Sequence, residues 1–409
     1  MPFDRMERRL SGDLAELGRE GRLKGAESVV CQMVPADGER GPRVRLAGEG
    51  ESLFLRMNSN GYLGMALRPE VIAAEEAATR VFGTGPQAVR FIGGTLLPHL
   101  KLEERLAAFH GREAAMIFSS AYAAVMGILP PLVTPETAVI SDELNHNCII
   151  NAIRLSRPAQ RHVYAHLDLG ELESALEKAS ADCRRCIVVT DGVFSMRGDC
   201  APLDRIAELV GVWDEHFAEN AVLVVDDSHG VGALGRRGRG TEELAGAGAD
   251  VLVATLGKAL GVNGGYAVGS RTLVDYLREV APFYVYSNPI TAGEAAAAGA
   301  ALDLLDGAVG EALLAHLRAM TARFEQGLVR LGYETLPGPH PVVPLLVRDT
   351  ARAAALVAHL RAHGILATGL GYPVVPKGDE EIRFQISAEH TEADIDEVLR
   401  VLEHFSGRS

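Results

Sequence analysis

Short apolar segments alternate with longer helical stretches between about residue 51 and about residue 290. Their hydrophobicity is continuous rather than alternating, which is typical of strands buried on both faces of a parallel sheet. Strand–helix alternation over this length predicts an α/β doubly wound domain, with a mostly parallel sheet flanked by helices. The predicted strands are Ala114–Phe118, Thr137–Ser141, Cys186–Thr190, Ala221–Val225 and Asp250–Ala254.

The stretches between these strands have the apolar spacing of helices. Asp168 and Glu171 stand at capping-box spacing, so a helix is predicted over Leu169–Ala181. A longer helix is predicted over Leu203–Asn220. These elements belong to a large domain that we expect to span residues 55–295.

The pattern changes beyond Thr291, which stands at capping-box spacing from Glu294 and opens an Ala-rich helix. Helices and strands then follow in a mixed order, which predicts a smaller α+β domain over residues 296–409. Residues 1–54 are charged and broken by Gly and Pro, and they indicate an arm or short helix followed by loop. The C-terminal elements are predicted as helices over Ala295–Asp306, Glu311–Leu331 and Ala351–His363, strands over Val342–Val347 and Glu381–Ser387, and a last helix from Thr391.

Composition narrows the class of protein. The chain has 409 residues, of which 47% are hydrophobic and 23% charged, as in ordinary globular proteins of two or three units. A net charge of −14 argues against a nucleic-acid partner, because phosphate binding needs a basic surface. No apolar run is long enough for a membrane span, and the N-terminus lacks the apolar core of a signal peptide. The pair Cys183 and Cys186 has no second pair at zinc-ribbon spacing, so a cytoplasmic protein with reduced thiols is expected.

Polar residues follow the predicted strand Ala221–Val225 directly, beginning with Asp226 and ending with His229. Catalytic groups in parallel α/β sheets gather at the carboxyl ends of strands, although a polar loop start would look the same. Three glycines then spell GxGxxG from Gly230 to Gly235. The continuation is loop rather than helix, so a flexible turn is favoured over a dinucleotide site.

Lys258 follows the next predicted strand and is flanked by small residues. Burial there would lower the pKa of its amine and free it to attack a carbonyl. A lysine that forms a Schiff base, with an acid such as Asp226 to protonate a pyridine nitrogen, is the constellation of pyridoxal 5′-phosphate sites. The turn Ser119–Tyr122 precedes a predicted helix, where backbone N–H groups can hold a phosphate. The order of phosphate turn, acid and lysine predicts a pyridoxal phosphate enzyme acting on an amino acid.

Longer runs carry a family resemblance. Through these runs the chain resembles the α-oxoamine synthases of the fold-type I, aminotransferase-like pyridoxal phosphate enzymes. The runs follow one another in that family's order across about residues 55–395. The matching runs are NGYLGM (Asn60–Met65), VRFIGGT (Val89–Thr95), SDELNH (Ser141–His146), TDGVFSMRGD (Thr190–Asp199), VDDSHGVG (Val225–Gly232), TLGKALG (Thr255–Gly261), YPVVPKG (Tyr372–Gly378) and IRFQISAEHT (Ile382–Thr391).

The resemblance implies roles for individual residues. Lys258 would hold the cofactor and remove the α-proton, and Asp226 would keep the pyridine nitrogen protonated. His146 would stack on the cofactor ring, while His229 and Ser195 would bond its oxygen. The implied phosphate contacts are Ser120, Ala121, Tyr122, Thr255 and, from the partner of a homodimer with active sites at the subunit interface, Ser287.

On the substrate side, the resemblance implies that Arg383 grips the amino-acid carboxylate, with Asn60 as a further polar group. His99 could equally contact substrate or pack in the core. The implied reaction condenses an amino acid, glycine first among the candidates, with an acyl-CoA. The acyl chain stays open, and an aminotransferase or aldolase on the same fold remains a rival.

Overall fold

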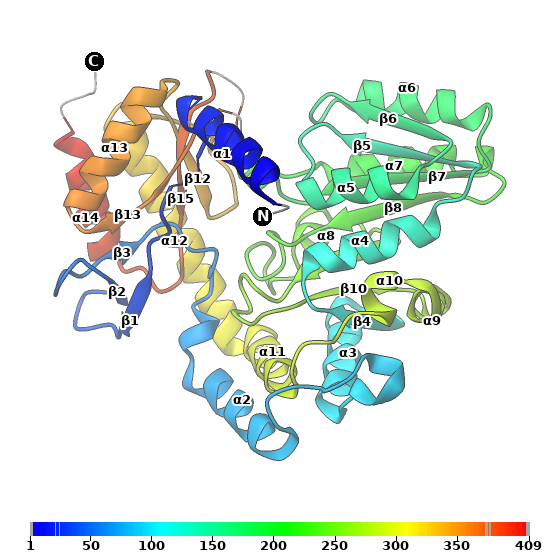
Figure 1. The fold of residues 1–409 in the computed structure, drawn as a ribbon, viewed down its shortest axis with the longest axis horizontal. Coiled ribbons are helices and arrows are strands. Elements are labelled where there is room, and N and C mark those ends of the chain that lie inside the picture. The colour runs from blue at the N-terminus through cyan, green and yellow to red at the C-terminus, as the bar shows by residue number, and fades with distance from the viewer. Residues whose placement is uncertain (1–2, 21, 24, 373–374, 376–377, 406–409) are drawn as a thin grey trace.

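The large sheet of the protein, as seen in a computed structural model, has seven strands in the order β4-β10-β9-β8-β7-β5-β6 (Figure 1). The structure describes residues 3–20, 22–23, 25–372, 375 and 378–405, so four residues of the YPVVPKG run lie outside it. All five predicted strands are confirmed, with shifts of a residue or two at their ends. The strands are β4 (Ala114–Phe118), β5 (Thr137–Asp142), β6 (Gln160–Tyr164), β7 (Arg185–Asp191), β8 (Ala221–Asp226), β9 (Val251–Thr255) and β10 (Gly265–Gly269).

Two strands of this sheet were not predicted from the sequence. The β6 strand lies at the edge of the sheet, and its first four residues alternate between partly buried and exposed instead of forming a buried run. The β10 strand is antiparallel to both neighbours and contains glycine at each end, which weakens any strand pattern in the sequence. The remaining strands from β9 to β6 pair in parallel, as the continuous apolar runs predict.

Helices cover both faces of the large sheet (Figure 1). Asp168 caps α6 as predicted, but the carboxylate of Glu171 accepts from the backbone of Ala165 instead of closing a capping box. The helix predicted to reach Asn220 ends earlier, because Asp214 accepts from Asn220 and Ala221 and turns the chain into β8. The helices are α2 (Pro69–Phe82), α3 (Leu97–His110), α4 (Ala121–Leu132), α5 (Asn147–Ser156), α6 (Leu169–Ser180), α7 (Leu203–Trp213), α8 (Thr241–Ala245), α9 (Arg271–Val280) and α10 (Pro282–Val285).

The C-terminal region forms a second, antiparallel sheet in the order β11-β12-β15-β14. The predicted capping box of Thr291 with Glu294 is confirmed, and the last helix, predicted from Thr391, begins with a capping box of Thr391 and Asp394. The elements are α11 (Ala292–Leu305), α12 (Ala308–Arg330), β11 (Glu334–Thr335), β12 (Val342–Leu346), α13 (Thr350–Ala362), β13 (Ile365–Leu366), β14 (Thr368–Leu370), β15 (Glu381–Gln385) and α14 (Glu392–Glu403).

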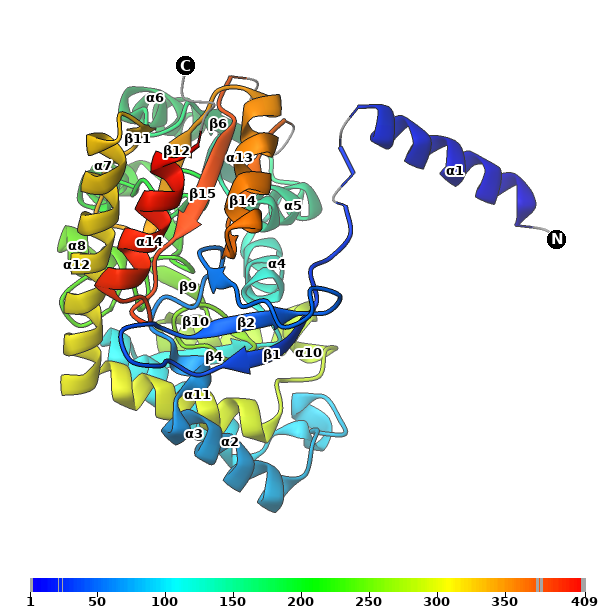
Figure 2. The same ribbon diagram turned by 90° about the vertical axis from the view of Figure 1, so that its left-hand side faces the viewer.

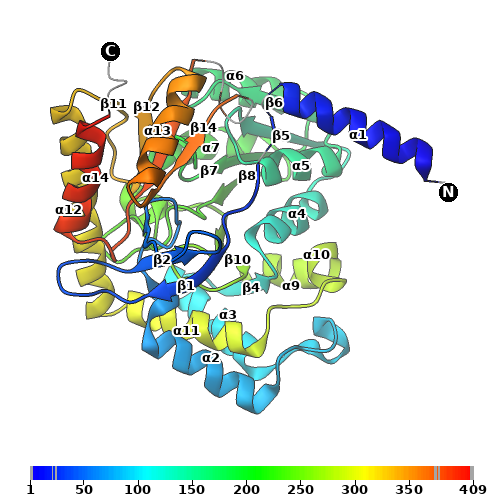
Figure 3. The same ribbon diagram turned by 60° about the vertical axis from the view of Figure 1, so that its left-hand side comes forward.

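The N-terminal segment was predicted as an arm or short helix followed by loop, and it contains a helix and, in place of the loop, short strands. Helix α1 (Asp4–Arg19) has no buried residue and projects away from the body of the chain (Figure 2). A hairpin of β1 (Val30–Val34) and β2 (Arg43–Leu46) follows, and Figure 3 shows it beside the C-terminal elements. The short strand β3 (Leu55–Arg56) pairs with β13. Within the described ranges, no helix is both long and apolar enough to cross a membrane.

Candidate active site

One cavity gathers nine of the predicted site residues at the carboxyl ends of the parallel strands. It adds four residues that were not predicted, namely Cys148, Asp191, Val193 and Ser228. The carboxyl ends meet here because β7, β8 and β9 run in parallel and in register. The predicted residues are Ser120, Ala121, Tyr122, His146, Ser195, Asp226, His229, Thr255 and Lys258.

Asp226 ends β8 and pairs in register with Asp191 at the end of β7. Its Oδ1 accepts from the backbone N–H of Ser228 at 3.1 Å, which fixes the carboxylate. Its Oδ2 accepts from the thiol of Cys148 at 3.7 Å. Burial, and then the neighbouring charge of Asp226, raise the pKa of Asp191 well above its usual value. Asp191 therefore favours its neutral form beside Asp226.

Lys258 reaches the same cavity from the turn after β9. Burial lowers the pKa of its amine, although the carboxyl groups of Asp226 and Asp191 act in the opposite direction. A lowered pKa increases the fraction of neutral amine, which is the nucleophilic and basic form.

The ring of His229 forms a hydrogen bond with Tyr62, whose hydroxyl lies 2.7 Å from Nδ1. Burial, and then the positive charge of Lys258, lower the pKa of His229 well below the usual histidine value, so the ring is neutral. Burial also raises the pKa of Tyr62, which keeps that hydroxyl a donor. When the Tyr62 hydroxyl donates to Nδ1, the ring proton of His229 stands on Nε2.

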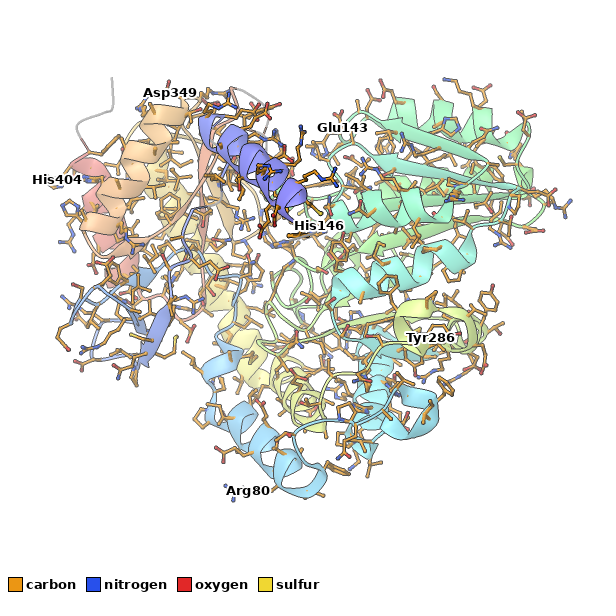
Figure 4. The ribbon with its side chains drawn as sticks, viewed as in Figure 1. Arg80, Glu143, His146, Tyr286, Asp349 and His404 are labelled. Carbon is orange, nitrogen blue, oxygen red and sulfur yellow. The ribbon has the colours of Figure 1, made fainter. Side chains whose placement is uncertain are left out.

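His146, labelled in Figure 4, stands at the N-cap of α5. Its backbone N–H donates to the carboxyl of Asp191 at 2.9 Å, which anchors the turn. Its Nδ1 lies 2.9 Å from the Cys148 sulfur. Burial lowers the pKa of His146, with Asp226 opposing, so a neutral ring is favoured at the cavity wall.

The N-terminus of α4 forms another wall. Ser120 caps this helix by accepting from the N–H of Ala123 at 3.0 Å. The first amides of a helix have no partner within it, so those of Ala121 and Tyr122 suit an anion. A side chain at Gly265 would place its Cβ 2.1 Å from the nitrogen of Ala121, so glycine lets β10 approach this turn.

The predicted GxGxxG segment is a turn, as expected, and its first glycine has a packing role. Asp227 is fully buried next to Asp226, and it accepts from the N–H of Thr241 at 2.7 Å. A Cβ at Gly230 would lie 2.0 Å from the Asp227 carboxyl. The glycine therefore makes room for a buried acid and does not open a helix as in a dinucleotide site.

Arg383 lies beside the cavity on β15. Its Nη1 donates to the backbone oxygen of Ser195 at 3.0 Å. In the amide orientation that satisfies its neighbours, Gln385 accepts from the Arg383 guanidinium at 2.9 and 3.1 Å. Asn60 lies 3.1 Å from the Gln385 amide and 3.5 Å from the Tyr62 hydroxyl. Arg383 and Asn60 thus belong to one polar network that reaches the cavity through Ser195 and Tyr62.

Two predicted residues lie apart from both the cavity and this network. His99 is 0% exposed, and its ring nitrogens contact the backbone N–H of Leu96 and the backbone oxygen of Ile290. This placement favours the packing role, because both polar atoms are already satisfied, and a substrate contact of His99 stays a prediction. Ser287 is half-buried, and its hydroxyl donates to the neighbouring Asn288 oxygen at 3.5 Å. Its phosphate contact stays a prediction that requires a second subunit.

The loop that carries Ser195 is fastened by His166. The two ring nitrogens each lie 3.0 Å from a carboxylate, one of Asp142 and one of Asp199. Burial opposes protonation, but these two carboxylates raise the pKa of His166 to about 9. A charged His166 therefore bridges β5 to the loop, and its ring packs edge-on against Phe194 at 4.4 Å.

Replacing His166 with glutamine is expected to reduce the amount by which the free energy of unfolding falls at alkaline pH. Because the pKa is raised on folding, the stabilisation is complete below the unfolded value of about 6.5 and disappears as pH rises through about 9. The wild type should lose on the order of 2 kcal/mol of unfolding free energy across this window. Urea titrations between these pH values measure it, with the exposed His216→Gln as control. If the free energy of unfolding falls equally with pH in His166→Gln and in the wild type, the charged bridge of His166 is contradicted.

Comparison with known proteins decides the family. Residues 54–402 match the family model "Aminotransferase class I and II". The chain is 40% identical to human mitochondrial 2-amino-3-ketobutyrate coenzyme A ligase, covering 95% of this chain and 89% of that protein. It is 39% identical to 8-amino-7-oxononanoate synthase 1 of Bacillus velezensis, with 91% and 92% covered. The chain belongs to the α-oxoamine synthases within this aminotransferase family.

Solved structures agree with this family. Serine palmitoyltransferase of Sphingomonas wittichii is 28% identical and superposes with a TM-score of 0.87, covering 98% of this chain and 97% of that one. A high-resolution structure of a serine palmitoyltransferase with pyridoxal phosphate is 25% identical, with a TM-score of 0.84 and coverage of 98% and 96%. The predicted fold-type I architecture is therefore confirmed for the synthase.

The cavity of this synthase fits pyridoxal phosphate, which is its cofactor. It combines a lysine of lowered pKa, a fixed carboxylate and the N-terminus of a helix. It also contains the hydroxyl of Ser228, a buried polar atom without a partner among the described residues. An unsatisfied buried hydroxyl in a cavity is a position where a ligand atom is expected.

Proposed function

We propose that this α-oxoamine synthase condenses an amino acid, glycine in the first place, with an acyl-CoA thioester and releases CoA. The observation that carries the proposal is the single cavity in which Lys258, Asp226, His146 and His229 meet, with Arg383 at its edge. The coenzyme A ligase and oxononanoate synthase names of the relatives support an acyl transfer. The ligase-like reaction on glycine is the form we favour.

Pyridoxal phosphate, when bound, supplies an electron sink that stabilises negative charge on the α-carbon of an attached amino acid. In the proposed arrangement Lys258 holds the cofactor through its ε-amine. Asp226 would keep a proton on the pyridine nitrogen, because its carboxylate is fixed by Ser228 and lines the cavity. The Nε2–H of His229 and the Ser195 hydroxyl donate to the ring oxygen. The α4 turn with Ser120, and the Thr255 hydroxyl, receive the phosphate.

Lys258 is also the group that removes the α-proton. Its lowered pKa leaves the Nζ able to accept a proton once it is released from the cofactor. His146 lines the same cavity, where a neutral ring would stack on the cofactor and face the incoming thioester. The thioester carbon would be the electrophile presented to the α-carbon at this position, and the thiolate of CoA would be the leaving group.

Arg383 receives the amino-acid carboxylate. A guanidinium binds a carboxylate with two parallel hydrogen bonds, and Gln385 and Ser195 hold this one in place. The carboxylate and the attached amine then fix the α-carbon between Arg383 and Lys258. Asn60 supports this end through its contact with Gln385.

A homodimer with active sites at the subunit interface, and a cytoplasmic location, remain part of the proposal. Tyr286 is 79% exposed next to Ser287, in a segment where a partner subunit would meet this one. Phe91 and Ile92 are each 69% exposed in the VRFIGGT run. Exposed large apolar side chains such as these favour a surface that a partner subunit covers.

The proposal is tested by mixing the cofactor-loaded protein with glycine, alanine or serine and a panel of acyl-CoAs from acetyl to palmitoyl. We expect that the release of free thiol depends on glycine. Its rate should saturate as the concentration of one class of acyl-CoA is raised. The measurement is the rate of thiol release with a colorimetric reagent. Amino transfer to a keto acid, with no thiol released from any acyl-CoA, would instead assign an aminotransferase.

A further inference from the structure

His340 is a buried histidine of the C-terminal region that contacts a residue of the cavity. It precedes β12 and is 1% exposed. Its Nε2 lies 2.9 Å from the backbone oxygen of His229, and its Nδ1 accepts from the backbone N–H of Val342 at 3.1 Å. A ring nitrogen that accepts a hydrogen bond carries no proton, so the proton stands on Nε2 and is donated to His229. Burial also lowers the pKa of His340 to about 4, which agrees with a neutral ring.

The rings of His340, Tyr62 and His229 pack against one another. The His340 ring meets the Tyr62 ring edge-on, with centroids 5.3 Å apart, and its centroid lies 5.9 Å from that of His229. The Tyr62 hydroxyl lies 2.7 Å from Nδ1 of His229. His229 is therefore held at two points, at its backbone oxygen by His340 and at its ring by Tyr62. Both contacts come from distant parts of the chain.

The segment that carries His340 also supports the arginine proposed to bind the amino-acid carboxylate. Val342, which donates to His340, opens β12 and pairs with Gln385 of β15. The Gln385 amide in turn accepts from the Arg383 guanidinium, in the orientation that satisfies its neighbours. His340 therefore joins the strand pair that carries Arg383 to the main chain of His229.

We propose that His340 is a positioning residue, which holds the main chain of His229 so that the His229 ring meets the ring oxygen of the cofactor. The inference rests on the cofactor contact proposed for His229. A hydrogen bond weakens steeply as its length and angle change, so the ring contact depends on where the main chain is held. Without the His340 donor, the backbone oxygen of His229 would be buried and unpaired, which favours a shift of that main chain.

His390 offers a matched control, because it is buried in the same way and makes the same pair of contacts. Its Nδ1 accepts from the backbone N–H of Ser387 at 3.1 Å, and its Nε2 lies 3.1 Å from the backbone oxygen of Arg56. Arg56 belongs to β3 and is not among the described residues that line the cavity. Replacing His390 therefore removes equivalent hydrogen bonds but no contact of His229.

The test measures the dissociation constant of pyridoxal phosphate by absorbance titration, without any substrate. His340→Asn keeps an acceptor near the Nδ1 position but is too short to reach His229, and it should weaken the affinity about tenfold. His340→Gln places an amide N–H near the Nε2 position and should stay within about twofold of the wild type. His390→Asn should also stay within about twofold. The absorbance maximum of the bound cofactor should move in His340→Asn toward that of His229→Phe, and should not move in the other two variants.

A double-variant cycle shows whether His340 acts through His229. In the His229→Phe background, His340→Asn should weaken the affinity by less than about twofold, because the ring donor is already gone. An unchanged affinity in His340→Asn, or an equal loss in His340→Gln, in His390→Asn or in the His229→Phe background, would overturn the inference. Wild-type affinity in His229→Phe would overturn it as well, by refuting the cofactor contact on which it rests. None of these measurements depends on turnover, so a protein that releases no thiol from any acyl-CoA would overturn the proposed function separately.

Discussion

Replacing Lys258 with alanine is expected to abolish condensation, with kcat/KM lowered by about 10³-fold or more. The substitution removes both the covalent attachment of the cofactor and the base that takes the α-proton. The cavity should otherwise persist, because Asp226 and the α4 turn are held by contacts that do not involve Lys258. Initial rates of thiol release with saturating cofactor measure the effect, together with the visible absorbance of the bound cofactor.

Lys101→Ala serves as the control for the loss of a lysine, because Lys101 is exposed on α3. It should retain the wild-type rate and spectrum. A Lys258→Ala protein with the wild-type visible spectrum and a rate within a few-fold of wild type would contradict the assigned role.

Asp226→Asn is expected to lower kcat by roughly 10²- to 10⁴-fold. An amide carries no negative charge, so it cannot keep a proton on the pyridine nitrogen, and the carbanion loses its stabilisation. The size and the hydrogen bond from the Ser228 N–H are retained, so the fold should remain intact. Thermal melting and steady-state rates are measured together to separate folding from chemistry.

Asp191→Asn is the matched comparison for this prediction. Asp191 stands opposite Asp226 in the sheet but already favours its neutral form. The amide replaces a neutral carboxyl, so the loss of kcat should be at least tenfold smaller than in Asp226→Asn. Equal losses in the two variants would show that either carboxyl can serve, and would contradict the assignment of this role to Asp226 alone.

The fold was largely predictable where burial on both faces leaves continuous apolar runs, as in β7 and β8. Strands without such runs were missed. The β6 strand has one exposed face at the sheet edge, and β10 owes its place to pairing with β4 and β9 rather than to local propensity. The hairpin β1–β2 is also held by contacts with distant residues, including the ion pair of Arg43 with Asp394 at 2.6 Å.

The candidate site was predictable where residues directly follow buried strands. Asp226 and Lys258 do so, and the structure brings them to one cavity. Asp191 ends β7 in the same way and could have been found by that rule, whereas Cys148 lies inside the first turn of α5. His99 shows a limit of prediction from a family motif. A matching position in a family motif does not reveal that both ring nitrogens are taken by backbone partners.

Lys258 is proposed to carry the cofactor, and chemical trapping of the bond between them is the decisive experiment. Borohydride treatment of the cofactor-loaded protein converts a lysine-bound pyridoxal phosphate into a stable secondary amine. Proteolysis and mass spectrometry then locate the added mass. We expect one labelled peptide, containing the run TLGKALG with the label on Lys258. A label on another lysine, with Lys258 unmodified, would contradict the claim.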